Sequence, residues 1–306
     1  MKQLKKVLTV TLSLFVALAI AVGFMTACSS EDEVSAQSSN EQHSEYAELM
    51  AELSDYTATF CAIHESPSRK DWGWKKFRDA VKADFAGYSA GSAVHCISTS
   101  RKKWKELKLQ EQLEDIENSL DEGENNNESF NLSTSDKIYL SLQIDSLRNV
   151  YLSDKTNVGA LHNAAIYQSM LDDDTSFETT EELVQSVIRS LENLNVGSWD
   201  IDEKKAVQEV DEFFETIYDD NVSIMYKRLS QKYPEKQEAF KVLNQYGIAT
   251  SKIESVEDLV TFSEGYMRII RNSGLSDPVK DELIENISIF PSSQILWSGV
   301  DDMTDE

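Results

Sequence analysis

Apolar residues recur every three or four positions along most of this chain, which is the spacing of one face of an α-helix. The pattern predicts helices over residues 45–63, 72–95, 100–120, 157–171, 180–195, from about 202 onward, 235–246, 256–272 and 277–290. Pro291 is expected to end the last helix, and residues 301–306 are expected to form a frayed tail. Four Pro and eleven Gly in 306 residues also favour long helices over a β-sandwich. The prediction is a mainly α-helical protein, a helical bundle.

Two stretches depart from this pattern. Residues 121–131 are rich in Glu, Asn and Gly, which predicts a linker between an N-terminal helical region, residues 45–120, and an acidic C-terminal helical domain, residues 132–306. Just beyond the linker, Leu140, Leu142 and Ile144 alternate with polar residues, which is typical of a strand. The sequence thus allows two helical subdomains, with a candidate strand at the start of the second.

Charge is distributed unevenly along the chain. The net charge is −25, yet residues 69–108 hold eleven Lys or Arg against four Asp or Glu, a local net of +7. The acidic remainder produces a long-range field that repels nucleic acid, so nucleic acid is not expected among the partners.

A predicted basic helix, residues 72–96, stands out within that stretch. Its candidate interaction surface consists of Trp72, Trp74, Lys75, Lys76, Arg78, Lys82, Gly87 and Gly91. Basic and aromatic stripes are typical of helices that lie in a membrane interface, and two Gly four residues apart allow close approach of helix backbones. The Trp residues followed by an Ala/Gly-rich helix resemble bacteriocin-like peptides. The alternative interpretation makes this helix the small-residue core of the bundle, with its Lys side chains paired to acidic residues.

The N-terminus has the layout of an export signal. Lys2, Lys5 and Lys6 form a positive region, and an uncharged apolar run covers residues 7–25. Residues 1–27 are therefore predicted to be a signal peptide. An uncleaved membrane anchor is the alternative, because the run approaches the roughly 20 residues that span a bilayer.

Met25, Thr26, Ala27 and Cys28 resemble a bacterial lipobox, with Met25 where most lipoboxes have Leu, Val or Ile. The following acidic residues, 29–33, resemble the surface-export tag of Bacteroidota lipoproteins. This resemblance implies lipidation of Cys28, a membrane partner through the lipid anchor and a place at the outer membrane or cell surface. Secretion without an anchor is the alternative. Residues 28–44 are expected to be a flexible tether.

The two remaining cysteines, Cys61 and Cys96, are a candidate disulfide in an oxidising compartment. An unbroken helix over residues 72–95 would hold Cys96 about 36 Å from its start, far beyond the roughly 7 Å between Cα atoms that a disulfide allows. Either the helix breaks near Gly87 or Gly91 and folds back, or both thiols stay free and buried.

Candidate chemistry is sparse. Neither a zinc motif nor a catalytic or phosphate-binding motif is recognised, so neither a metal nor another cofactor is predicted, and an enzyme is not expected. Residues 158–163, which include His162 and Asn163, resemble a Gly-Lys-Leu-His-Asn pattern of uncharacterised exported proteins of Bacteroidota. The simpler interpretation is that His162 and Asn163 bridge two helices by hydrogen bonds.

These observations favour a lipid-anchored, exported helical protein that acts as a binding or interaction module at the cell envelope, with an unidentified protein partner. A membrane-active factor that works through helix 72–96 is the alternative function. A hydrolase in the acidic C-terminal half is the third.

Overall fold

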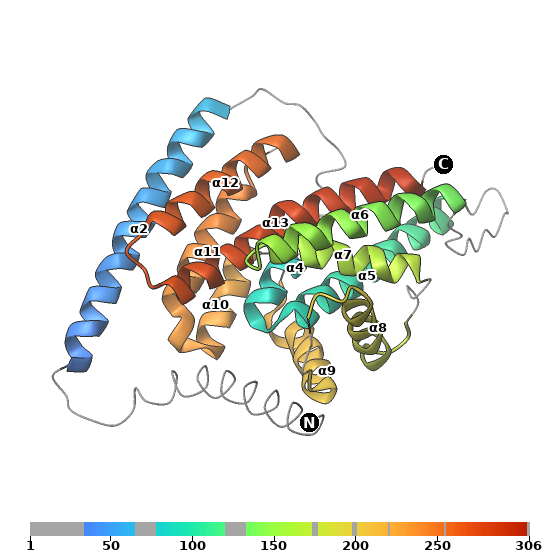
Figure 1. Cartoon of the computed structure of the whole chain (residues 1–306), viewed down its shortest axis with the longest axis horizontal. Coiled ribbons are helices and arrows are strands. Elements are labelled where there is room, and N and C mark those ends of the chain that lie inside the picture. Colours follow the sequence, from blue (N-terminus) through green and yellow to red (C-terminus); the bar gives the residue numbers. More distant parts are fainter. Residues whose placement is uncertain are drawn as a thin grey trace, which may run out of the picture. The chain divides into compact units, whose positions relative to one another are not determined.

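The computed structural model describes residues 34–64, 78–119, 133–172, 177–197, 201–219, 221–253 and 255–304. The signal peptide, Cys28, Trp72, Trp74, Lys75, Lys76 and the predicted linker lie outside these residues. The described part is 86% helical, with eleven α-helices and no strand, as the hydrophobic spacing predicted (Figure 1).

The helices of the described residues follow one another along the chain. They are α2 (Val34–His64), α4 (Arg78–Ala90), α5 (Ala93–Ser119), α6 (Thr134–Ser153), α7 (Val158–Leu171), α8 (Thr180–Asn193), α9 (Glu203–Glu212), α10 (Val222–Lys232), α11 (Gln237–Thr250), α12 (Val256–Asn272) and α13 (Asp277–Thr304). A π-helical turn η2 (Phe213–Ile217) follows α9, and a 3₁₀ turn η3 (Pro234–Lys236) precedes α11. Helix α10 was not predicted from the sequence, and α2 begins at Val34, within the predicted tether.

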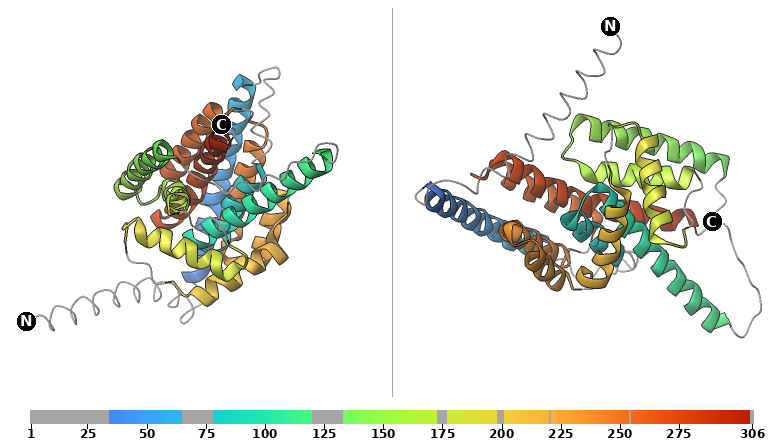
Figure 2. Two further views of the ribbon diagram at one scale, coloured as in Figure 1. Left: turned by 90° about the vertical axis from the view of Figure 1, so that its right-hand side faces the viewer. Right: turned by 90° about the horizontal axis from the view of Figure 1, so that it is seen from below.

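The described residues from Glu45 onward form one compact unit, which is larger than the unit assigned to the residues before it. In the larger unit, α13 packs against α4, α7, α11 and α12, while α5 packs against α4, α7, α8 and α9. Helix α6 lies alongside α7 (Figure 2). Helices from both sides of residues 121–131 therefore share one core, and the two predicted subdomains are not separate compact units.

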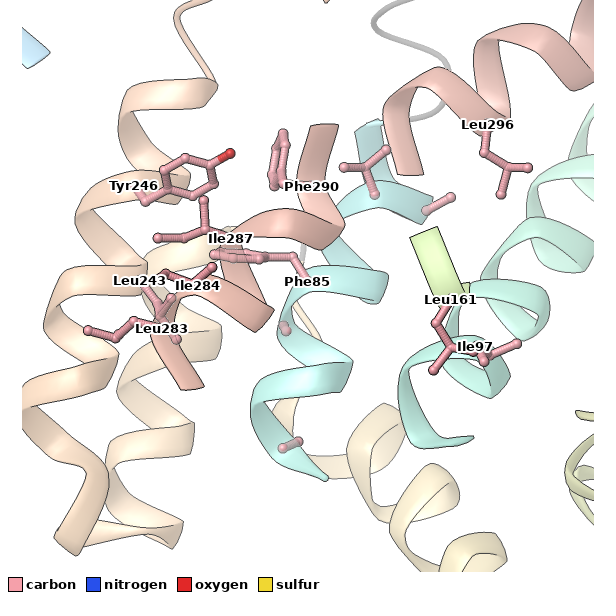
Figure 3. Packing of buried hydrophobic residues seen from close by; sticks show 14 of the residues in the cluster. Phe85, Ile97, Leu161, Leu243, Tyr246, Leu283, Ile284, Ile287, Phe290 and Leu296 are labelled. Carbon is pink, nitrogen blue, oxygen red and sulfur yellow. The ribbon is translucent and has the colours of Figure 1, made fainter. Parts of the chain in front are cut away.

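The centre of the core brings together side chains from five helices. Phe85 of α4, Ile97 of α5 and Leu161 of α7 are at most 1% exposed. Tyr246 of α11 and Phe290 of α13 lie with their ring centroids 5.5 Å from that of Phe85 (Figure 3). Such aromatic contacts add to the free energy gained by burying apolar surface.

The predicted helix 72–95 ends inside the basic stretch. Helix α4 stops at Ala90, Gly91 forms a turn in which its N–H donates to the Tyr88 carbonyl at 3.2 Å, and α5 folds back against α4. Gly87 permits this packing, because a Cβ there would lie 2.2 Å from Thr99 Oγ1 of α5. The Thr99 hydroxyl in turn donates to the Ala83 carbonyl at 3.2 Å. The break near Gly91 is thus one of the two arrangements that the sequence allowed.

The strand interpretation of residues 137–152 is wrong, since this segment is helix α6. Ser133 and Asp136 form a capping box, with Ser133 N donating to Asp136 Oδ2 at 2.8 Å and Asp136 N donating to Ser133 Oγ at 3.2 Å. The buried and half-buried apolar residues of the helix are Leu140, Ile144, Leu147 and Tyr151, which follow helical spacing. Leu142 made the pattern look alternating, but it is 64% exposed.

Pro291 does not end the last helix, as α13 continues through it to Thr304. Proline lacks the N–H that would bond to the carbonyl four residues earlier and costs about 3 kcal/mol within a helix. Burial on both sides offsets that cost, since Phe290 is 4% exposed, Leu296 0% and Trp297 1%. The segment after Pro291 is therefore held by tertiary contacts, several of which are polar.

Candidate functional site

The part of the predicted basic helix that the structure describes, from residue 78 onward, lies largely in the interior. Residues 80–90 of α4 are buried or half-buried. Lys82 is 13% exposed and pairs with Asp79 at 3.0 Å. The observation agrees with the interpretation of this segment as bundle core, with Lys82 paired to an acidic residue.

The second half of the basic stretch packs on aromatic rings. Lys102 Nζ lies 4.9 Å from the ring centroid of Phe214 and 3.2 Å from Asp211 Oδ1. Lys103 Nζ lies 4.8 Å from the ring centroid of Tyr218. The ammonium groups of both lysines thus interact with side chains of the bundle itself. A cation over an aromatic face contributes about 0.5–2 kcal/mol.

The most unusual chemistry of the described residues is a buried carboxylate on α4, Asp84, which is 0% exposed. Two side chains of α13 donate to its Oδ2, the Ser293 hydroxyl and, at 3.2 Å, Trp297 Nε1. His162 Nε2 of α7 lies 3.5 Å from the same oxygen. We call Asp84, His162, Asn163, Ser293 and Trp297 the Asp84 centre, which connects α4, α7 and α13.

Asn163 joins α7 to α13 by a hydrogen bond, as the simpler interpretation of the sequence predicted, whereas His162 Nε2 has no hydrogen-bond partner in the described part of the chain. His162 Nδ1 lies 2.9 Å from Asn163 Oδ1, and Asn163 Nδ2 donates to the Ser292 carbonyl of α13 at 2.7 Å. The α7 segment that carries them approaches α13 closely at Gly159, where a Cβ would lie 2.2 Å from the Ser288 carbonyl oxygen. Gly159 N also donates to Ser288 Oγ at 3.0 Å.

Burial raises the pKa of Asp84, because the charged form loses its hydration. His162, Ser100, Ser293 and Trp297 oppose this rise, since each favours the ionised carboxylate. Helix α5 closes the centre from the other side, where the Cys96 thiol donates to the Asp84 carbonyl at 3.2 Å. Burial, and then the nearby Asp84, raise the pKa of Cys96, so that its thiol stays neutral.

The Asp84 centre contains a Ser, a His and an Asp, but not in the order of a catalytic triad. In a triad the His takes the proton of the Ser hydroxyl, and the Asp orients the His. Here the Ser293 hydroxyl donates directly to Asp84, and Asp84, His162 and Ser293 are each at most 1% exposed. The arrangement is therefore suited to joining helices through polar contacts in the interior.

The two cysteines are free thiols, so the candidate disulfide is not formed. Cys61 lies near the end of α2 and is partly exposed, whereas Cys96 is buried on α5 and directed at the backbone of α4. The fold-back near Gly91 thus brings Cys96 to α4 and not to Cys61.

A second buried histidine, His95 at the start of α5, is 1% exposed, and neither ring nitrogen has a hydrogen-bond partner in the described part of the chain. Its ring packs edge-on against Phe213 at 5.3 Å between centroids. Burial, and to a smaller extent the charge of Lys232, lower the pKa of His95 to about 3. His95 is therefore neutral in the folded protein at neutral pH.

This lowered pKa predicts that acid destabilises the fold through His95. Between about pH 6.5 and pH 3 the unfolded chain protonates this histidine and the folded chain does not, so stability falls as pH falls, by about 1.4 kcal/mol per pH unit. In urea titrations at about pH 6.5 and pH 4.5, His95→Leu should lose about 2.3 kcal/mol less than the wild type over that interval, because the unfolded histidine is already half protonated at pH 6.5. Equal losses in the two proteins would contradict the prediction.

Helix α6 carries an exposed apolar face that the sequence pattern did not reveal. Ile138 is 59% exposed, Tyr139 49% and Leu142 64%, and the three lie within the first three turns of the helix. Ile138 and Leu142 are four residues apart and so are neighbours on the helix surface. We call these three residues the α6 apolar face.

Other candidate sites are small in the described residues. No group of three or more His, Cys, Asp or Glu there is placed to hold a metal ion, and no helix there has the length and apolar character needed to cross a membrane. A cavity of about 20 Å³, lined by residues that include Lys82, Gly247 and Gln294, has room for about one water molecule.

Sequence reasoning did not select Asp84, His95, Ser293 or Trp297. The signal that could have pointed to Asp84 is its position between Ala83 and Phe85, an acid within an otherwise apolar run. Ser293 and Trp297 were not expected to belong to a helix, because Pro291 was expected to end the helix before them. Comparison of the chain with protein-family models, curated proteins and solved structures finds no match.

Proposed function

We propose that this protein is an exported, lipid-anchored helical module that binds a protein partner at the cell envelope through the α6 apolar face. The observation that carries the proposal is the exposure of Ile138, Tyr139 and Leu142 on one helix of a tightly packed unit. Large apolar and aromatic side chains on a surface are the residues that anchor protein interfaces. The lipobox-like residues before Cys28 support the envelope location.

The membrane-active alternative requires residues 80–90 to leave the interior. Those residues are buried or half-buried, and Phe85 and Ala86 are 0% exposed. Exposing them would remove Val81 and Phe85 from the core, each worth about 1.5–3 kcal/mol, together with several buried Ala side chains. The α6 apolar face is accessible without any such rearrangement, which is why the binding function is preferred.

The proposal is tested by photo-crosslinking in cells that express the chain with a photoreactive phenylalanine analogue in place of Tyr139. We expect a discrete protein adduct in the membrane fraction. Ile138→Asp together with Leu142→Asp should reduce that adduct at least about 30-fold, because interface anchors each contribute about 2 kcal/mol or more. Adduct formation that is unchanged by these substitutions would contradict the proposed surface.

Two matched variants complete the experiment. Ile224→Asp with Ile248→Asp places the same charges at exposed apolar residues of α10 and α11, which are 39% and 41% exposed, and should leave the adduct unchanged. Cys28→Ser should move the chain out of the membrane fraction while its Tyr139 surface stays intact. Retention of the Cys28→Ser chain in that fraction would favour the alternative anchor, an uncleaved apolar run over residues 7–25.

A further inference from the structure

We infer that the surface of α12 that faces α2 is a binding site for an amphipathic helix. Helix α2 occupies this site within the same chain, and a helix of a partner protein with the same pattern can take its place. The inference concerns residues 45–64 of α2, which lie alongside α12 in the larger unit (Figure 1). It goes beyond the proposed function, because it involves a different helix from the α6 apolar face.

Residues 45–64 bury one stripe of side chains. The members of this stripe that are at most 7% exposed are Tyr46, Leu49, Leu53 and Phe60. With the half-buried Tyr56, they follow one another at intervals of three and four residues, the spacing by which an amphipathic helix docks on a surface. The other residues of this segment are exposed or half-buried. Helix α2 thus contacts the bundle in the way that a separate helical ligand does.

The most specific contact of the stripe joins Tyr56 to Gly265 of α12. The Tyr56 ring stacks on Phe262 with ring centroids 5.4 Å apart, and its hydroxyl donates to the Phe262 carbonyl at 3.2 Å. A Cβ on Gly265 would lie 2.5 Å from Tyr56 Cζ, well inside the contact distance of two carbon atoms. Gly265 therefore leaves a notch that the tyrosine side chain fills and that a larger residue would close.

Contacts at its two ends fix the direction of the docked helix. His64 Nδ1 lies 2.8 Å from Oδ1 of Asp258, in the first turn of α12. At the other end Glu45 lies against Gly274, two residues after the end of α12, where a Cβ would be 3.4 Å from Glu45 Cγ. The docked helix therefore runs antiparallel to α12. With Tyr56 in the notch, these ends define one register.

The floor of the site is held by contacts that do not involve α2. Phe262 stacks on Tyr246 of α11 at 5.9 Å and packs against Tyr266 at 5.5 Å between ring centroids. The hydroxyls of Tyr246 and Ser263 are joined by a hydrogen bond of 2.7 Å. An element at the edge of a protein that has few buried side chains can open without global unfolding. We therefore expect the α12 surface to keep its shape when α2 leaves.

The occupant that fits this site is an amphipathic helix with a tyrosine for the notch at Gly265. Eight residues after that tyrosine, at the position of His64, a positively charged side chain is favoured because it faces the Asp258 carboxylate. The partner helix replaces α2 and does not add to it. Helix α2 thus lowers the apparent affinity for the partner by the fraction of chains in which the site is free.

The test measures binding of a fluorescent peptide with the sequence of residues 45–64 to the full chain. Leu49→Asp with Leu53→Asp loosens α2 in that chain, and fluorescence anisotropy should then show saturable binding with a micromolar Kd. The wild-type chain should bind the peptide at least about 100-fold more weakly, because its own α2 occupies the site at a high effective concentration. Equal binding by the two chains, or none by a folded double variant, would overturn the inference.

Variants of the peptide and of the notch test the register. Tyr56→Ala in the peptide should weaken binding at least about 30-fold, which is typical of an interface anchor. The matched control, Thr59→Ala, truncates an exposed residue of the same helix and should leave binding unchanged. Gly265→Ala in the loosened chain fills the notch and should abolish binding. Peptide binding that survives both Tyr56→Ala and Gly265→Ala would count against the inference.

Native-state hydrogen exchange on the wild-type chain decides the question even if the double variant does not fold. We expect the amides of residues 45–64 to exchange by a local opening, at lower denaturant concentration than those of α12 and α4. Exchange of α2 only together with α12, in global unfolding, would overturn the inference. Wild-type dimers that dissociate on Tyr56→Ala would also overturn it, since α2 would then dock on a second copy of the chain.

Discussion

Replacing Asp84 by Ala is expected to lower the free energy of unfolding by about 3–5 kcal/mol, the cost of breaking a buried pair and leaving its partner unpaired. The carboxylate accepts from Ser293 and Trp297 and lies 3.5 Å from His162 Nε2. Removing it leaves the Ser293 hydroxyl and the Trp297 indole N–H in the interior without their acceptor. Urea unfolding followed by circular dichroism measures the loss.

A double-mutant cycle shows how much of this loss belongs to the pair itself. If Asp84 and His162 interact as described, Asp84→Ala and His162→Ala should couple by about 1 kcal/mol or more. Asp258→Ala on the surface, which breaks the contact with His64, should cost less than about 1 kcal/mol. A loss below about 1 kcal/mol for Asp84→Ala, or additive single effects, would contradict a stabilising interaction between Asp84 and His162.

Trp297→Ala is expected to have an effect of similar size, about 3–5 kcal/mol. The Trp297 side chain is 1% exposed and stacks on Trp104 with ring centroids 4.5 Å apart. Its loss leaves a cavity next to Asp84 and removes one of the contacts that hold α13 together after Pro291. Because the substitution removes a fluorophore, circular dichroism is the appropriate measurement.

Trp297→Phe divides this effect into its two causes. Phenylalanine retains much of the stacking on Trp104 but cannot donate to Asp84, so the variant should lose about 1.5–3 kcal/mol, the worth of a hydrogen bond to a charged group. Equal losses for the Phe and Ala variants would mean that packing contributes little. A Trp297→Ala chain as stable as the wild type would contradict the role given to this residue.

Much of the helical structure could be predicted from the chain because helix signals are local. The predicted helix 256–272 matches α12, and the predicted start near residue 157 matches α7, whose first N–H groups are capped by Asn157. The caps at Thr179 and Asp202 likewise lie where α8 and α9 begin. Each of these signals involves residues three or four positions apart, which the sequence displays directly.

The candidate sites were harder to predict because their contacts are long-range. Asp84 contacts Ser293 and Trp297, which lie 209 and 213 residues further along the sequence. No local pattern therefore indicates that this acidic residue of α4 is buried. The exposed α6 apolar face was missed for the opposite reason. Apolar side chains suggest burial, and only the packing of α6 on α7 determines that Leu142 lies outside while Leu140 lies inside.

The sequence alone determined that this protein is helical, where most of its helices begin, and that its N-terminus resembles a lipoprotein signal. The tertiary structure decided that the basic helix breaks near Gly91 and enters the core, that α13 continues through Pro291, and that Asp84 and His162 meet. The physical reason is that spacing and capping depend on neighbouring residues. The environment of a charge or a proline depends on which distant helices pack around it.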